Sequence, residues 1–281
     1  MSQGNIELIS QQLEQRISTK TLALPMLPQV TSQVLSLVND VNSDAAALSK
    51  LIQSDQALAG HVMRIANSAA YSPTTKMTSL QQAIARLGMQ NIAEIAMAAT
   101  MGPKMFQVKG FESVVAELWQ SSLAIAVWAR EIARQGRRNV ESTFLCGLLF
   151  QIGRPVVLQT VLDLARSSSL EVTPDQVSAL MDKYQAEVGT VLADHWHLPT
   201  AVRHTINGVD IDVAAEGSQE IVDTVKAARV FAAYTMADRH YDADSLTANP
   251  YIVEINLYAD DIQRLLDKAD SVHDTIGALS L

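Results

Sequence analysis

The chain has 281 residues, enough to bury one large hydrophobic core or the cores of two smaller lobes. Hydrophobic residues make up 48% of it and aromatic residues only 5%, as is typical of helical proteins rich in Ala and Leu. The net charge of −9 argues against direct binding of nucleic acid, which needs a basic surface, and the single cysteine excludes a disulfide within the chain. Because that cysteine, Cys146, lies in an apolar run, it is expected to be a small core residue rather than a nucleophile.

Helical periodicity dominates the chain and strand-like alternation is nearly absent, so we expect an all-α protein of two packed helical lobes. An amphipathic helix is expected within residues 1–20. A second helix follows Pro25 and Pro28 and reaches about residue 39. Asp44 and Asp55 each precede a run rich in Ala and Leu, which predicts that they cap the next two helices.

Residues 64–88 have the pattern of a helix end, a loop and a new helix. Ser79 is the predicted N-cap of the new helix, with Gln82 at the spacing of a capping box. Gly88 is predicted to end this helix in a left-handed cap, which costs least for a residue without Cβ. We place the boundary between the lobes at residues 102–110, after the helix that follows Gly88.

The second lobe is also predicted to be helical throughout. Thr173 begins one of its helices, followed by Pro at the first helical position and Gln at the third. Further helices are expected at residues 112–134, 141–152, 155–165, 184–196, 199–207, 217–239 and 260–277. No window offers the roughly 18 uncharged apolar residues of a membrane span, which indicates a cytoplasmic protein without membrane insertion.

A cluster of arginines stands out against the acidic composition. It consists of Arg130, Arg134, Arg137 and Arg138. Cations favour the C-terminal end of a helix, so we interpret the cluster as a solvated helix end. An anion or phosphate site is the alternative.

Residues 64–88 resemble, nearly residue for residue, the signature of the HDOD (HD-related output domain) family, "R-x-A-N-S-A-x-Y", a short loop and "T-S-L-x-x-A-I-x-x-L-G". The matching residues are Arg64, Ala66, Asn67, Ser68, Ala69, Tyr71, Thr78, Ser79, Leu80, Ala83, Ile84, Leu87 and Gly88. Residues 24–28 match the family's "L-P-x-L-P", and residues 52–58 match "I-x-x-D-P-A-L" with Gln56 in place of Pro. Residues 141–149 and 196–199 complete a resemblance over roughly residues 20–215.

The resemblance implies a domain organisation. An N-terminal helix at residues 1–20 precedes an HDOD domain at 20–215, whose N-terminal lobe is 20–108 and whose second lobe, at 109–215, is a degenerate HD-type helical bundle. Helices at residues 216–281 are expected to pack on this HD-like lobe.

The family is similar to the HD metal-dependent phosphohydrolases, in which His and Asp side chains hold metals that activate water. Here Ser121 stands where the first His is expected, and Phe150 and Gln151 replace the adjacent His-Asp pair. Gln185 replaces a further His, and Asp238 alone matches the late Asp. We therefore expect no catalytic residue, no metal and no cofactor.

The resemblance implies a non-catalytic cytoplasmic signal-transduction module that binds a regulatory partner protein or a small ligand. The candidate interaction surface is Arg64, Asn67, Tyr71 and Lys76, with the alternative that Arg64 and Asn67 brace the two lobes. A metal-dependent phosphohydrolase with atypical ligands and a scaffold for oligomerisation are the other hypotheses. The partner, the ligand and the oligomeric state stay open.

Overall fold

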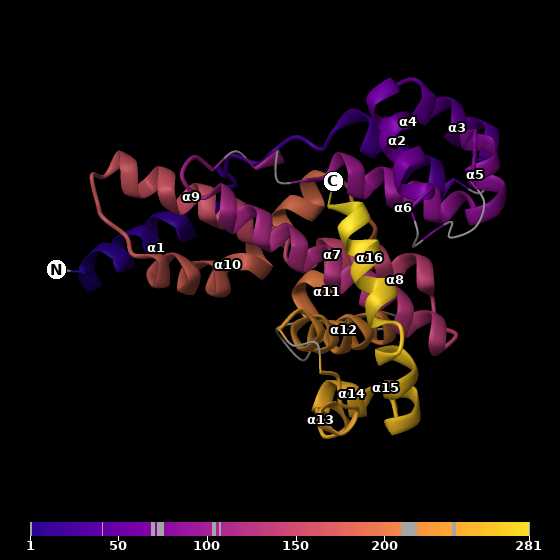
Figure 1. Cartoon of the computed structure of the whole chain (residues 1–281). Helices are drawn as coiled ribbons and strands as arrows, with labels where there is room; N and C mark the ends of the chain where they lie inside the picture. Colours follow the sequence, from indigo (N-terminus) through magenta and orange to yellow (C-terminus); the bar gives the residue numbers. More distant parts are fainter. Residues whose placement is uncertain are drawn as a thin grey trace.

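The computed structural model describes residues 2–40, 42–68, 71, 76–102, 105–106, 108–208, 218–237 and 240–280. Every element of regular secondary structure in these ranges is a helix, which confirms the all-α class (Figure 1). Helices from residues 29–100 gather at one end of the molecule, and the longer helices form most of the rest.

The first group of helices packs mainly within itself. It comprises α2 (Gln29–Asn39), α3 (Ala45–Gln53), α4 (Gln56–Ala66), α5 (Leu80–Leu87) and α6 (Met89–Thr100). The two predicted aspartate caps are confirmed: carboxylate oxygens of Asp44 and Asp55 accept hydrogen bonds from the amides of Ala47 and Leu58, at 2.8 and 3.0 Å.

The caps of α5 are only partly as predicted. Ser79 Oγ accepts from the Gln82 amide at 3.2 Å, but the Gln82 side chain accepts from the amide and hydroxyl of Thr78 rather than from Ser79. Gly88 has a φ of 87°, yet its ψ of 156° lies outside the left-handed helical region. It therefore ends α5 and begins α6 in a conformation that favours glycine.

The second group is built around α7 (Glu112–Gln135), the longest helix of the described chain. Its other members are α8 (Val140–Leu149), α9 (Gly153–Ser167), α10 (Pro174–His195), α11 (Thr200–Gly208) and α12 (Gln219–Ala237). Helix α7 packs against α8 and α12, while α9 pairs with α10. The N-terminal helix α1 (Ser2–Ser18) lies on α9 and α10 (Figure 1), away from the first group.

Three expectations in this second half were wrong. Helix α10 is continuous from Pro174, so no separate helix begins at residue 184. The predicted capping box at its start, on Thr173, is confirmed. Two short helices, α13 (Asp244–Thr247) and α14 (Pro250–Glu254), were not expected. The predicted helix at 260–277 is divided into α15 (Ala259–Leu266) and α16 (Ala269–Leu279).

The division between α15 and α16 occurs at Asp267 and Lys268, with neither Gly nor Pro to signal it. The Asp267 amide donates to Gln263 O and the Lys268 amide to Leu265 O, both at 2.9 Å, which tightens the last turn. The chain then changes direction into α16, which packs on both α7 and α6. The C-terminal helices therefore contact both groups.

One stretch, Ser142–Ser167, is apolar and long enough to meet the composition of a membrane span, although it contains the charged residues Arg154, Asp163 and Arg166. It covers most of α8 and all of α9, and 83% of its apolar window is buried inside the protein. Such burial is typical of core helices in a soluble protein.

Helices α9 and α10 cross so closely that the contact requires glycine. A Cβ on Gly153 would lie 2.1 Å from Gln185 O and 2.7 Å from the Gly189 amide nitrogen. Both are backbone atoms of α10, which cannot yield as the end of a flexible side chain could. The crossing fixes Gln185 relative to the end of α8.

We predict that Gly153→Ala lowers the free energy of unfolding by about 3 kcal/mol, because the added methyl group forces the two helices apart. Urea unfolding followed by circular dichroism measures this. Gly277→Ala is the matched control: its Cβ meets nothing within 4 Å on an exposed face of α16, so stability should hold or rise by about 0.5 to 1 kcal/mol. Equal stability of the two variants would contradict the tight crossing.

A remodelled HD-type pocket and the junction of the lobes

The described positions at which the resemblance led us to expect replaced metal ligands lie together in space. Ser121 of α7, Phe150 and Gln151 after α8, and Gln185 of α10 all line one pocket of about 380 Å³. Helix α12 closes it through Arg229, Ala232, Ala233 and Met236. The remaining position, Asp238, follows the end of α12 and lies outside the described residues.

Phe150 places a buried aromatic ring at the pocket. Its side chain is only 4% exposed, and the Arg229 guanidinium carbon lies 5.2 Å from the centroid of its ring. A cation over an aromatic face is favourable, so this pair stabilises the pocket without a metal.

Gln151 uses its amide to hold the bundle together. Its Nε2 donates to Ser122 Oγ at 2.8 Å and to Leu118 O at 3.1 Å, both on α7. Gln185 is also buried, beside the glycine crossing. Both positions therefore carry neutral side chains in the bundle interior.

The residues of this pocket do not fit a catalytic divalent metal. Its charged lining is Glu117 with Arg154 and Arg229, one carboxylate against two guanidinium groups. Divalent catalytic metals need several imidazole or carboxylate ligands, and cations nearby repel them. Across the described ranges, no three His, Cys, Asp or Glu side chains are grouped to hold a metal.

The candidate interaction surface divides into inward and outward residues. The Asn67 side chain donates to Met63 O at 3.0 Å and to Met77 O at 2.9 Å, and accepts from the Met77 amide at 2.6 Å. It therefore ties the end of α4 to the segment before α5. Arg64 and Lys76 are exposed on either side of this clamp.

Tyr71 faces the second group of helices. Its hydroxyl accepts a hydrogen bond from Arg130 Nη1 at 3.0 Å, and the Arg130 guanidinium carbon lies 5.6 Å from its ring centroid. Tyr71 thus connects the signature segment to α7 across the junction of the lobes.

The interpretation of the arginine cluster as a solvated helix end was wrong for Arg130, which is only 5% exposed. Burial on its own lowers the pKa of this guanidinium, but Tyr71, Glu94 and Glu131 outweigh it and raise the pKa above its ordinary value. The feature of the sequence that could have indicated the burial of Arg130 is its place in the apolar run from Ala124 to Ala133.

Arg138 was also assigned to that solvated end, but its side chain connects distant segments. It donates to Thr224 Oγ1 on α12 at 3.0 Å and to Ile255 O after α14 at 2.8 Å. These contacts explain why this arginine follows the turn after α7.

Cys146 is fully buried, as expected of a core residue. Burial raises the pKa of its thiol to about 12, so the thiolate is scarce at neutral pH.

Comparison with known proteins identifies the family. The HDOD domain model matches residues 24–210, more than half of the chain. The chain belongs to the HDOD family.

Solved structures share the fold of this HDOD protein. A candidate metal-dependent phosphohydrolase of Shewanella amazonensis SB2B is 20% identical, with a TM-score of 0.73, over 98% of this chain and 99% of that one. An HDOD domain protein of unknown function from Geobacter sulfurreducens is 21% identical, also with a TM-score of 0.73, over 95% and 98% of the two chains. A candidate signal-transduction protein of Marinobacter aquaeolei VT8 is 20% identical, with a TM-score of 0.62, over 99% of this chain and 67% of that one.

A curated relative comes from Treponema pallidum (strain Nichols) and has no characterised function. It is 22% identical over 249 residues, which cover 85% of this chain and 48% of the relative. The HDOD chain therefore spans about half the length of the curated relative it matches.

Because the described lining of the pocket offers no metal-ligating set, we predict well under one atom of Mn, Fe, Zn or Mg per chain, and no phosphodiesterase or phosphatase activity with any added divalent ion. Elemental analysis of the purified protein and hydrolysis assays with chromogenic phosphate esters measure this. One bound transition metal per chain, lost on Asp238→Ala, would contradict the prediction.

Proposed function

We propose that this HDOD protein is a non-catalytic, cytoplasmic signal-transduction module that binds a regulatory partner protein or a small ligand. The observation that carries the proposal is the pocket around Phe150, whose described lining brings together Ser121, Phe150, Gln151 and Gln185, none of them a usual ligand of a catalytic divalent metal. The fold shared with a candidate signal-transduction protein supports the same conclusion.

The alternative, a phosphohydrolase with atypical ligands, has less support. Its chemistry would need a group of imidazoles and carboxylates, whereas the pocket presents two guanidinium groups and one carboxylate. The buried Cys146 thiol does not supply a nucleophile in its place.

A partner surface is proposed at Arg64 and Lys76. Both side chains are exposed, and the three hydrogen bonds of the Asn67 clamp hold Met63 and Met77, their neighbours in the chain. Backbone that is already held in place loses little conformational entropy when a partner binds, so these two positions suit recognition. Two cations on an acidic protein favour an acidic partner surface.

We predict that Arg64→Glu with Lys76→Glu abolishes capture of a regulatory partner that the wild-type chain retains. Both positions are exposed, so the free energy of unfolding should change by less than about 0.5 kcal/mol per substitution. The measurement is quantitative affinity capture from a lysate of cells that express the chain naturally, together with a melting curve for each variant.

The matched control is Arg166→Glu with Arg264→Glu, which makes the same charge change at side chains that are 71% and 65% exposed. This control should retain the partner. Loss of the partner in both double variants would show a general charge effect, and retention in both would remove these residues from the surface.

A further inference from the structure

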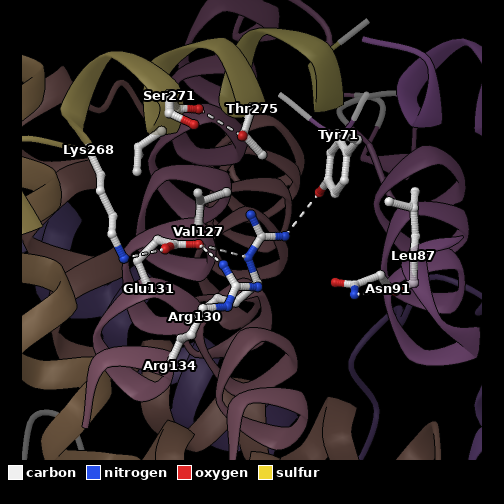
Figure 2. A pocket seen from close by; sticks show the side chains of 11 residues that line it. Tyr71, Leu87, Asn91, Val127, Arg130, Glu131, Arg134, Lys268, Ser271 and Thr275 are labelled. Carbon is white, nitrogen blue, oxygen red and sulfur yellow. Dashed lines mark hydrogen bonds and ion pairs between the residues drawn. The ribbon is translucent and has the colours of Figure 1, made fainter. Parts of the chain in front are cut away.

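A second cavity, of about 240 Å³, lies at the junction of the lobes (Figure 2). Tyr71, Leu87 and Asn91 form one wall, α7 forms the floor, and α16 with the residue before it forms the other wall. No residue of the Phe150 pocket lines it. It is therefore a separate site.

The lining of this junction cavity is cationic. Arg130, Arg134 and Lys268 face it, and Glu131 is the only carboxylate among the residues that line it. The Arg134 and Lys268 side chains are 50% and 39% exposed and lie at its mouth, whereas Arg130 is buried at its base. The whole chain carries a net charge of −9, so this concentration of cations runs against the composition.

Arg130 keeps hydrogen-bonding capacity at the cavity. Figure 2 shows its guanidinium between Glu131 and Tyr71, and Nη1 donates to the Tyr71 hydroxyl at 3.0 Å. Its Nε is buried and has no hydrogen-bond partner in the described chain; Glu131 Oε1 is 3.6 Å away, an ion-pair distance. A buried donor without a partner is costly, so an acceptor that reaches it is favoured.

Glu131 organises the cations but does not neutralise them all. It contacts Arg134 Nη1 at 2.5 Å and Lys268 Nζ at 3.1 Å. Burial raises the pKa of its carboxyl, but the three neighbouring cations outweigh this and lower the pKa, so Glu131 is ionised at neutral pH. Glu94, which is buried near Arg130, is a second carboxylate. The three cations Arg130, Arg134 and Lys268 therefore outnumber the two carboxylates, Glu131 and Glu94.

We propose that the junction cavity binds a small molecule that carries a phosphoryl group. A planar guanidinium and an ammonium suit a phosphate oxyanion, and the hydroxyls of Ser271 and Tyr71 add polar contacts around it. The volume is below the roughly 300 to 1,000 Å³ of sites for drug-sized ligands, which favours a compact phosphomonoester over a dinucleotide. The inference rests on the proposed function, because it gives the signalling module a ligand class and a site.

A ligand in this cavity would contact both lobes and the C-terminal helix at once. Tyr71 and Asn91 come from the first group of helices, Arg130 and Arg134 from α7, and Ser271 from α16. Binding therefore stabilises one arrangement of these three parts, which is the form a regulatory signal would take.

Titration calorimetry with inorganic phosphate, and separately with glycerol 3-phosphate, tests the proposal at constant ionic strength set by chloride. We expect saturable binding of one phosphate per chain. Arg134→Gln and Lys268→Gln, at the partly exposed mouth, should each weaken binding about tenfold or more, since each removes a charged hydrogen-bond donor. Arg166→Gln, at an exposed side chain outside the cavity, is the matched control and should bind as the wild type does.

Absence of saturable heat with both probes would overturn the inference, as would equal weakening by Arg134→Gln and Arg166→Gln. Tighter binding of glycerol 3-phosphate than of inorganic phosphate would assign the site to a phosphomonoester, and the reverse to free phosphate. Partner capture through Arg64 and Lys76 does not use this cavity. Retained capture without phosphate binding would therefore remove the ligand site alone and leave the proposed function standing.

Discussion

The structure depends on one buried cation, Arg130, at the place where its parts meet. A guanidinium that is 5% exposed is costly to bury unless nearby carboxylates balance its charge. The balance comes from Glu131 on the same helix and from Glu94 on α6, and Tyr71 accepts a hydrogen bond from the signature segment. The charge of α7 therefore positions elements that lie far apart in the sequence.

In the second lobe, packing and amide hydrogen bonds hold together the residues around Phe150. A metal joins helices by drawing side chains to one point. Here Gln151 joins the end of α8 to α7 through two hydrogen bonds, and the Phe150 ring packs under Arg229. The crossing at Gly153 fixes α10 against the same point through backbone contact. The architecture thus persists on packing and amide hydrogen bonds.

Local chemistry in the sequence predicted much of the fold. Aspartate caps at residues 44 and 55 and the capping box at Thr173 require only residue type and spacing, so they could be identified directly. The divided helix at Asp267 and Lys268 could not, because packing on α7 and α6 determines the change of direction and no Gly or Pro marks it.

The candidate sites were predictable to different degrees. The resemblance brought Ser121, Phe150, Gln151 and Gln185 to one pocket, but the surrounding charge of Arg154 and Arg229 required the structure. The junction cavity draws on three separate segments, including Lys268. From the sequence Arg130 was assigned to a solvated helix end, and its burial and the residues that balance its charge required the structure.

A double-mutant cycle between Tyr71→Phe and Arg130→Met tests the central claim most directly, with the free energy of unfolding measured in urea for all four proteins. If the Tyr71 hydroxyl joins the signature segment to α7 through Arg130, the two effects should be non-additive by at least about 1 kcal/mol, as for a hydrogen bond to a charged group. Effects that add within about 0.3 to 0.5 kcal/mol would show that the two side chains do not interact, and would contradict the account of the junction.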